Sequence, residues 1–485
     1  MLTRLLVVVV TLGVYVSNSP AIAQHRVAGE PEALYFEHCS SCHGRDFQGG
    51  SAKSLVNPEW LEDDALGHLT QTISEGLPQA GMPAWKDQLD AQQIRALAIL
   101  VREAAHFDAR DKKQAVEWDA SSVFESEAHS FTLEVVGRGD SRLWAVDFLP
   151  DGSILSTQHD GKLWRFKNGK RSEIKNIPPS YNYRQGGLLD VMVHPDYEKN
   201  GWIYMTLGEK NPEHEAGSTT IVRGKISGER WTNTEYLFRV PEDERDIWSI
   251  HWGSRLLYQD GDVYFSYGDG GQKDRAQDTR DHAGKIHRIR EDGSTPADNP
   301  FVREEGFIGS LKAIIFGEAP TVWSYGHRNP QGLAIHPVSN DIWSVEHGPR
   351  GGDELNRISR GTNYGWPAVS HGIGYGGDPV SPFTELPGME GPKHFWIPSI
   401  APGAADFYTG DKFPYWKNNL FVTGMATEEL RRIVVDEGNR VVLEEVVLKD
   451  VGRVREVVDG PDGYLYIILN SGSGSLIVRL IPKTR

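Results

Sequence analysis

The stretch Leu149-Pro150-Asp151-Gly152-Ser153-Ile154-Leu155 (LPDGSIL) joins a tight-turn signal to the start of an apolar strand. Proline, aspartate and glycine favour a turn, and the aliphatic residues that follow favour a short strand. Similar turn-and-strand units recur at unequal intervals through the C-terminal part of the chain, at residues 194–205, 259–265, 336–343, 416–422 and 460–466. A chain that repeats one such unit is predicted to build several similar small β-sheets.

Six copies of this unit predict a six-bladed β-propeller over residues 130–485, with one copy in each blade and long loops between copies. The 52 glycines and 14 tryptophans also suit a turn-rich β protein. A β-sandwich, or several small β domains, is the alternative interpretation. In a propeller, long loops gather on one face around a central channel, where a large ligand can bind.

The N-terminal part follows a different pattern. Residues 24–106 read as helices and loops, with a helix starting at Pro31, apolar helical spacing over 66–73, and an amphipathic pattern over 91–103. Residues 107–129 are polar and rich in charge, which predicts a linker. We therefore expect a small all-α domain ahead of the mainly β domain.

The first residues predict export. Arg4 precedes a short apolar run over 5–16, and Ala21-Ile22-Ala23 offers small residues for cleavage, so residues 1–23 are predicted to be a signal peptide. A membrane anchor is the alternative. No later stretch approaches the ~20 apolar residues of a membrane-spanning helix, so no stable membrane insertion is expected. We expect a periplasmic or secreted protein, whose net charge of −16 argues against a nucleic-acid partner. The oligomeric state is not indicated.

Cys39 and Cys42 are the only cysteines in the chain, and His43 follows them directly. Two cysteines at this spacing can form a redox dithiol, half of a zinc site or an attachment point. A redox dithiol needs a βαβ context that this helical segment lacks, and a zinc site needs further ligands. The CxxCH pattern is that of haem c attachment, in which both thiols bind the porphyrin and His43 is an axial ligand of the iron.

Met82, in Gly81-Met82-Pro83-Ala84-Trp85, is the candidate for the other axial ligand. Core packing is the alternative role for a methionine. With the HCSSCHG and GMPAW segments and a final amphipathic helix, residues 30–105 resemble small monohaem cytochromes c. His–Met ligation raises the haem potential, which suits an electron acceptor.

Polar motifs are concentrated at five places in the β region. They are 185–189 (QGGLL), 249–255 (SIHWGSR), 325–332 (YGHRNPQG), 346–356 (EHGPRGGDELN) and 363–367 (NYGWP). Arginines and glycine-rich backbone suit a polyanionic ligand, and carboxylates with free carbonyls suit a hard cation such as calcium. His327 and His347 are expected to be structural hydrogen-bonding groups, and Asp269 is expected to stabilise a turn.

Four of these motifs, together with HPDY at 194–197, occur in the order found in soluble PQQ-dependent aldose (glucose-type) sugar dehydrogenases, and residues 140–482 resemble that family. The resemblance implies a six-bladed propeller that binds pyrroloquinoline quinone (PQQ) and calcium. It also implies oxidation of an aldose at C1 to a lactone. One segment departs from the pattern, because Gly424-Met425-Ala426-Thr427 lacks the lysine that glucose dehydrogenases use to bind the cofactor, which leaves substrate breadth open.

The resemblance also implies roles for individual residues. His251 would be the general base that takes the hydroxyl proton, a task that suits a side chain of near-neutral pKa, and Arg328 would act beside it. The implied PQQ contacts are Gln185, Arg328, Asn329, Tyr375, Arg453 and Arg455. The implied calcium ligands are the carbonyls of Gly348 and Pro349 and, at a second site, Glu354 and Tyr364.

Together these features predict an exported quinohaemoprotein. Hydride from the sugar would reduce PQQ, and the electrons would pass through haem c to an external acceptor, either a redox protein or a quinone. One alternative is a calcium-dependent propeller lactonase or other hydrolase with an appended cytochrome, which leaves the haem without a task. A non-catalytic propeller that binds a partner is another alternative. Sorbosone-type aldehydes and alcohols remain open as substrates.

Overall fold

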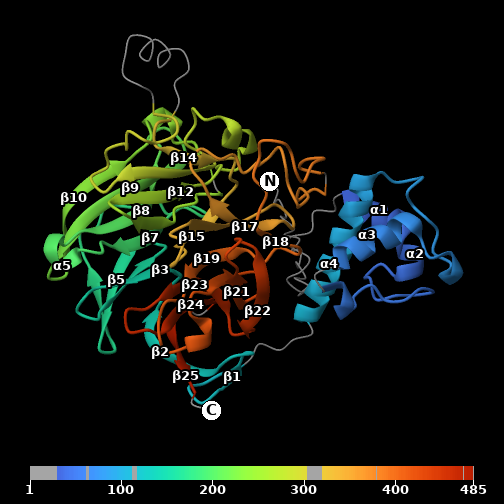
Figure 1. The fold of residues 1–485 in the computed structure, drawn as a ribbon, viewed down its shortest axis with the longest axis horizontal. Coiled ribbons are helices and arrows are strands. Elements are labelled where there is room, and N and C mark those ends of the chain that lie inside the picture. Colours follow the sequence, from blue (N-terminus) through green and yellow to red (C-terminus); the bar gives the residue numbers. More distant parts are fainter. Residues whose placement is uncertain are drawn as a thin grey trace, which may run out of the picture.

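The computed structural model describes residues 30–61, 65–111, 117–248, 250–302, 319–377, 379–472 and 474–483. The predicted signal peptide, residues 1–23, lies outside the described residues. The chain forms a small helical domain and a larger ring of β-sheets (Figure 1). Within the described residues the ring contains six sheets, which confirms the predicted six-bladed propeller with an all-α domain at its N-terminal end.

The helical domain is built on four α-helices and two 3-10 turns in its described residues. They are α1 (Glu30–His38), α2 (Ser40–His43), a turn at Pro58–Leu61, α3 (Ala65–Glu75), a turn at Pro78–Ala80 and α4 (Ala91–Asp111). Helix α4 continues into the segment predicted as linker. It is also buried on more than one side, because every residue from 96 to 105 is buried. A free amphipathic helix would leave one side of this segment exposed.

The core of the helical domain packs α4 against α1 and α3. Leu97 and Leu100 of α4 lie against Leu69 of α3, and Tyr35 of α1 stacks on Phe47 with ring centroids 4.0 Å apart. The Tyr35 hydroxyl donates to the Gly44 carbonyl at 2.6 Å, which ties α1 to the turn that follows α2. In Figure 1, α4 faces the propeller, and α2 lies on the side of the domain away from it.

Each blade of the propeller is a four-stranded antiparallel sheet, and the last one carries an additional short strand. The first three blades comprise β3 (Leu143–Phe148), β4 (Ile154–Gln158), β5 (Lys162–Lys167) and β6 (Lys170–Ile174); β7 (Leu188–Val193), β8 (Ile203–Lys210), β9 (Gly217–Ser227) and β10 (Arg230–Phe238); and β11 (Leu256–Gln259), β12 (Asp262–Tyr267), β13 (Lys285–Arg290) and β14 (Val322–Tyr325). The next two comprise β15 (Pro330–Ile335), β16 (Ile342–Glu346), β17 (Asp353–Ile358) and β18 (His394–Trp396); and β19 (Pro402–Phe407), β20 (Leu420–Gly424), β21 (Glu429–Val435) and β22 (Val441–Lys449). The last comprises β1 (Phe124–Glu125), β2 (Ser130–Gly139), β23 (Arg453–Asp459), β24 (Leu465–Ser471) and β25 (Gly474–Pro482).

The repeated turn-and-strand unit occupies the same place in all six blades. Every copy connects the innermost strand of a blade to the strand beside it, so the copies lead into β4, β8, β12, β16, β20 and β24. In the first copy, the Ser153 amide and hydroxyl both donate to Asp151, which fixes the turn before β4. A unit repeated at one topological position explains why unequal intervals still give equivalent blades.

The ring is closed by a strand from the start of the β region. In the last sheet, β2 pairs with β25 in an antiparallel register that runs from Phe131↔Pro482 to Gly139↔Ser475. The final blade therefore combines strands from both ends of the propeller, which leaves no open seam between first and last blade. Apolar clusters fill the space between neighbouring blades, with Trp252, Trp343 and Trp416 almost fully buried. No described helix has the length and apolar character needed to cross a membrane.

Candidate active site

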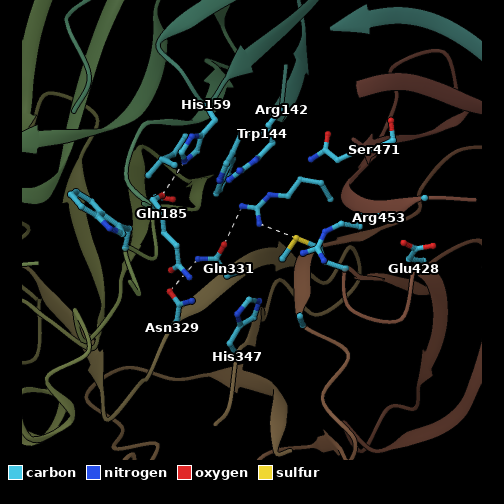
Figure 2. A pocket seen from close by; sticks show the side chains of 18 of the residues that line it. Arg142, Trp144, His159, Gln185, Asn329, Gln331, His347, Glu428, Arg453 and Ser471 are labelled. Atoms are coloured by element: carbon cyan, nitrogen blue, oxygen red, sulfur yellow. Dashed lines mark hydrogen bonds between the residues drawn. The ribbon is translucent and has the colours of Figure 1, made fainter. Parts of the chain in front are cut away.

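A cavity of about 830 Å³ opens at the end of the channel where the innermost strands begin. Its walls combine residues at the starts of β3, β15 and β23 with residues just after β4, β16, β20 and β24 (Figure 2). The side chains that carry its polarity are Arg142, His159, Gln185, Asn329, Gln331, His347, Arg453 and Arg455. A cavity of this size suits a small-molecule ligand or cofactor.

A buried histidine–aspartate pair lies next to this cavity, because Trp252 and Gly253, which follow His251 directly, line it. His251 Nδ1 is 2.6 Å from Asp269 Oδ1, and both residues are buried. Because a carboxylate only accepts, the shared proton is on Nδ1, which leaves the Nε2 lone pair to accept a proton. Burial and the nearby Arg328 charge lower the pKa of His251, and Asp269 opposes that shift. His251 is therefore neutral at neutral pH, as a general base must be.

The backbone around His251 is strained in a way that aims the side chain. His251 and Ser254 have φ angles of 60° and 94°, values that non-glycine residues rarely adopt. The Gln185 side chain stabilises this turn, because its Oε1 accepts the His251 amide at 2.8 Å. Gln185 and Trp252 both line the cavity, so the strained turn at His251 is directly connected to the cavity wall.

Arg328 and Trp366 complete the surroundings of the pair. Trp366 Nε1 donates to the second oxygen of Asp269 at 2.8 Å, and the Arg328 guanidinium lies 5.3 Å from the Trp366 ring. Arg328 also lies 6.0 Å from the ring of Tyr375, a largely exposed side chain. The GHRNPQG and NYGWP motifs therefore meet at His251 although they are distant in sequence.

The opposite wall of the cavity is cationic. Arg455 stacks over Trp144 at 4.1 Å and donates to Gln331 Oε1 at 3.0 Å and to Met425 Sδ at 3.3 Å. Burial, then the neighbouring Arg255 charge, lower the pKa of Arg455 to about 9. Arg255 is already paired with Asp190 and Glu456, but Arg142 and Arg453 line the same cavity as Arg455, so this wall is suited to an anionic ligand.

Two buried guanidinium groups retain unused donors. The Nε atoms of Arg328 and Arg455 have no hydrogen-bond partner among the described residues. Buried donors are normally satisfied, so these two are oriented for a ligand. A ligand with carboxylate oxygens in the large cavity would satisfy Arg455, which lines that cavity, whereas Arg328 lines the small cavity. The residues present therefore fit an anionic quinone such as PQQ.

A second, much smaller cavity of about 10 Å³ lies beside Arg328 and Glu346. Gly348, Pro349, Glu354 and Tyr364 all line it, so the residues predicted for two calcium sites surround one small space. The Tyr364 hydroxyl donates to the Arg357 carbonyl and accepts from the Ser359 amide, which leaves the main-chain carbonyl as the atom it can offer.

The small cavity fits a hard cation by the chemistry of its donors. Burial, then the Glu346 charge, raise the pKa of Glu354, and a cation placed between the two carboxylates would relieve both effects. The cavity has room for about one water-sized ion. Among the described residues no group of three or more His, Cys, Asp or Glu side chains can hold a metal, so carbonyl oxygens would have to supply most ligands, as calcium accepts.

The CxxCH segment fits covalent haem attachment. Cys39 caps the start of α2, Cys42 is exposed, and both thiols are free. Burial and the Cys42 charge raise the pKa of Cys39 to about 11, the opposite of what a redox dithiol needs. His43 Nδ1 lies 2.9 Å from the Lys53 carbonyl, so its proton is held there and Nε2 is left for iron.

Met82 is held in a position that suits an axial ligand. Its amide and carbonyl both bond to Leu77, at 3.1 and 2.9 Å, which fixes the loop that carries it. Met82 and Cys39 pack, partly buried, against the same apolar cluster of the helical domain. Met82 is therefore on the same core as the attachment segment, and its role as an axial ligand stays a prediction.

The structure assembles most of the predicted site and adds to it. Gln185, Asn329, Arg453 and Arg455 line the large cavity, and Arg328 lines the small one. Asp269 was expected only to stabilise a turn. It does accept the Gly271 amide, but it also holds His251. Four cavity residues were not predicted, because each stands outside the polar motifs and lines the cavity only once the blades are arranged in a ring. They are Arg142, Trp144, His159 and Met425.

The comparisons with known sequences divide the chain in the same way. Residues 140–478 match the Glucose / Sorbosone dehydrogenase family, and residues 27–101 match the family described as cytochrome C oxidase, cbb3-type, subunit III. An aldose sugar dehydrogenase of Escherichia coli is 35% identical over 341 residues, which cover 69% of this chain and 88% of that protein.

Solved structures agree with this division. The soluble aldose sugar dehydrogenase from Escherichia coli, in its apo form, superposes with a TM-score of 0.67 at 33% identity and covers 73% of this chain and 100% of that one. The PQQ-bound aldose sugar dehydrogenase from Streptomyces coelicolor superposes with a TM-score of 0.57 at 26% identity, covering 73% of this chain and 98% of that one.

Proposed function

Because the chain belongs to the glucose/sorbosone dehydrogenase family and carries a cytochrome c domain ahead of its propeller, we propose that it oxidises aldose sugars at C1 to lactones and delivers the electrons through its own haem. The chain is an oxidoreductase of the aldose sugar dehydrogenase type. PQQ, calcium and haem c are the cofactors that the proposal requires.

One observation carries the proposal: a neutral, buried His251 is held by Asp269 and directly precedes Trp252 and Gly253, which line the arginine-lined cavity. A neutral imidazole can take the proton of the sugar's C1 hydroxyl while hydride leaves the same carbon. Asp269 stabilises the imidazolium that forms, because its carboxylate is hydrogen-bonded to Nδ1. The proton then rests on His251 Nε2 until solvent removes it.

The overall reaction balances without water or oxygen. One aldose gives one lactone, two protons and two electrons. PQQ, when bound, supplies the two-electron acceptor for the hydride, and haem c supplies a one-electron carrier. The residues that would hold PQQ are Arg328, Arg455, Asn329 and Gln185, and the loop at Gly348 and Pro349 would hold the calcium that polarises it.

The helical domain supports the second half of the proposal. A dehydrogenase that passes electrons directly to a small diffusing acceptor does not need a covalently attached haem. His43 and Met82 would ligate the iron, and His–Met ligation gives the higher potential that a terminal carrier needs. The external acceptor would be a redox protein or a quinone, and the protein would work in the periplasm or outside the cell.

Reconstitution tests the proposal. PQQ, calcium and a panel of aldoses are added to the purified haem-loaded chain, and the haem absorption bands are followed. Haem reduction is expected only when all three are present. If neither haem reduction nor dye-linked turnover occurs with any aldose, sorbosone-type aldehyde or alcohol, while a lactone is hydrolysed, the chain is a hydrolase and the proposal is wrong.

A further inference from the structure

A buried ion cluster joins the helical domain to the propeller. Arg350, in the loop between β16 and β17, places Nη2 2.8 Å from Glu32 Oε1 of α1 and Nε 2.5 Å from Glu103 Oε2 of α4. The side chains of Glu32 and Glu103 are only 6% and 8% exposed, and that of Arg350 is 12% exposed. We propose that Arg350 is a positioning residue that docks the haem-binding domain on the rim of the active-site cavity. This inference rests on the proposed function.

The energetics of this cluster make it a switch between docked and undocked states. Two carboxylates and one guanidinium have been removed from water together, and the guanidinium of Arg350 pairs with a carboxylate from each of two helices. If Arg350 loses its charge, the carboxylates of Glu32 and Glu103 lose the guanidinium that pairs with them across the interface, and they stay buried as long as the domains stay docked. The domains can avoid that penalty by separating, which returns the charges to solvent.

Apolar contacts surround the cluster and exclude water from it. Ala96 and Ile99 of α4 pack against Ile373 and Ile397 of the propeller in one buried cluster. Arg95 of α4 also donates from Nη2 to the His371 carbonyl at 2.8 Å. These contacts explain why α4 is buried on the side that the core of its own domain does not cover.

The loop that carries Arg350 also forms the cavity wall. His347, three residues earlier, lines the large cavity, and Gly348 and Pro349 line the small one. Three residues of chain span at most about 11 Å, so the docking residue lies within that distance of the wall along the backbone. Arg350 is fixed there by a backbone pair with Ile373, in which both hydrogen bonds are 2.9 Å. The helical domain is therefore docked on a loop whose residues also line both cavities.

The test uses the full-length, haem-loaded chain with three single variants. Arg350→Met and Glu103→Gln break the cluster from the propeller side and from the helical side, and the second leaves the cavity loop intact. Arg357→Met is the matched control, because Arg357 pairs with Asp341 in the same blade and does not contact the helical domain in the described structure. Docking is followed by small-angle scattering and by the rate of proteolytic cleavage between the domains, without any cofactor chemistry.

Arg350→Met should raise the undocked fraction by roughly two to three orders of magnitude, because both carboxylates then stay buried without the guanidinium that pairs with them. Glu103→Gln should raise it less, because the pair between Arg350 and Glu32 remains. We expect Arg350→Met and Glu103→Gln to enlarge the radius of gyration and to speed cleavage between the domains. Haem reduction by the sugar, followed by stopped-flow absorbance, should slow at least tenfold in Arg350→Met and by a smaller factor in Glu103→Gln. In Glu103→Gln, which leaves the cavity loop intact, turnover with a dye that oxidises the propeller directly should stay unchanged. The control should match the parent protein in every measurement.

Two results would overturn the inference. Scattering and cleavage rates equal to those of the parent protein in both cluster variants would show that the cluster does not dock the domain. Undocking without slower haem reduction would show that docking does not position the haem. If the parent protein neither reduces its haem nor turns over with a dye, the proposed function fails, but the scattering and cleavage measurements still decide whether Arg350 docks the domain.

Discussion

Asp269→Asn is the substitution that most directly tests the chemistry of the site. The change keeps the size of the side chain, but it removes the charge that faces His251 across a 2.6 Å hydrogen bond. The charge centres of an imidazolium and a carboxylate in such a bond are about 4 Å apart, which corresponds to about 4 kcal/mol at an effective dielectric constant of about 20. Loss of that stabilisation in the transition state should lower kcat by about three powers of ten.

The tautomer adds to this effect. An asparagine can present its amide nitrogen to His251 Nδ1 and so move the ring proton to Nε2, where the base needs a lone pair. A comparable change in the serine protease triad costs about 10⁴ in kcat. The pH dependence gives a second signature. Asp269 raises the pKa of His251 against the effects of burial and Arg328. Its loss therefore lowers that pKa further, and the acid limb of the pH–kcat profile should move to lower pH.

The assay is dye-linked aldose oxidation with saturating PQQ and calcium, across a pH series, with the haem spectrum and bound PQQ measured on the same samples. Asp341→Asn is the matched control, because it neutralises a carboxylate paired with Arg357 far from His251, and its kcat should not change. A fall of less than tenfold in Asp269→Asn at every pH, with normal cofactor content, would refute the role given to the pair.

Three further predictions concern the cofactor sites. Arg455→Met should weaken PQQ binding by about 10- to 100-fold, measured by titration of the apo-protein, since it removes a charge-assisted hydrogen bond; an unchanged affinity would place the anion elsewhere. The pKa of Glu354 is raised by burial and by Glu346. The protonated Glu354 side chain therefore stabilises the fold fully below about pH 4.3, and this stabilisation is lost as the pH rises through the raised pKa. Without calcium, the melting temperature should therefore fall over that range, and either calcium or Glu354→Gln should reduce the fall; parallel curves in all three cases would contradict the site. Met82→Ala should lower the haem reduction potential in spectroelectrochemical titration and leave dye-linked turnover unchanged, and an unaltered potential would exclude ligation by Met82.

The fold was accessible from the sequence because its signals are local. Each blade contains a turn followed by a strand of alternating apolar residues, which can be recognised in the sequence. Both cysteines and their histidine lie within five consecutive residues. The closure of the ring by β2 was not accessible, because a strand's partner on another part of the chain leaves no mark in its own sequence. For the same reason Asp269 and Trp366 could be read as turn and motif residues but not as partners of His251.

The docking contact was also beyond sequence reasoning. Glu103 stands in an amphipathic helix, where a charged residue normally faces water, and Arg350 stands in a loop already assigned to cation binding. Only their approach across the two domains shows that each charge has a buried partner. The extension of α4 to Asp111, into residues predicted as linker, reflects the same contact, because packing on two sides stabilises a helix whose sequence turns polar.

The orientation of the helical domain separates two tasks in space. It meets the propeller through α4 and Glu32 of α1, while α2, which carries Cys42 and His43, lies on its outward side (Figure 1). Electrons would thus enter the domain on the face that meets the propeller and leave it on the opposite face. An acceptor protein can bind the outward face without displacing the propeller, so sugar oxidation and acceptor reduction do not compete for one surface of the domain. High acceptor concentrations should therefore saturate the rate without inhibiting it.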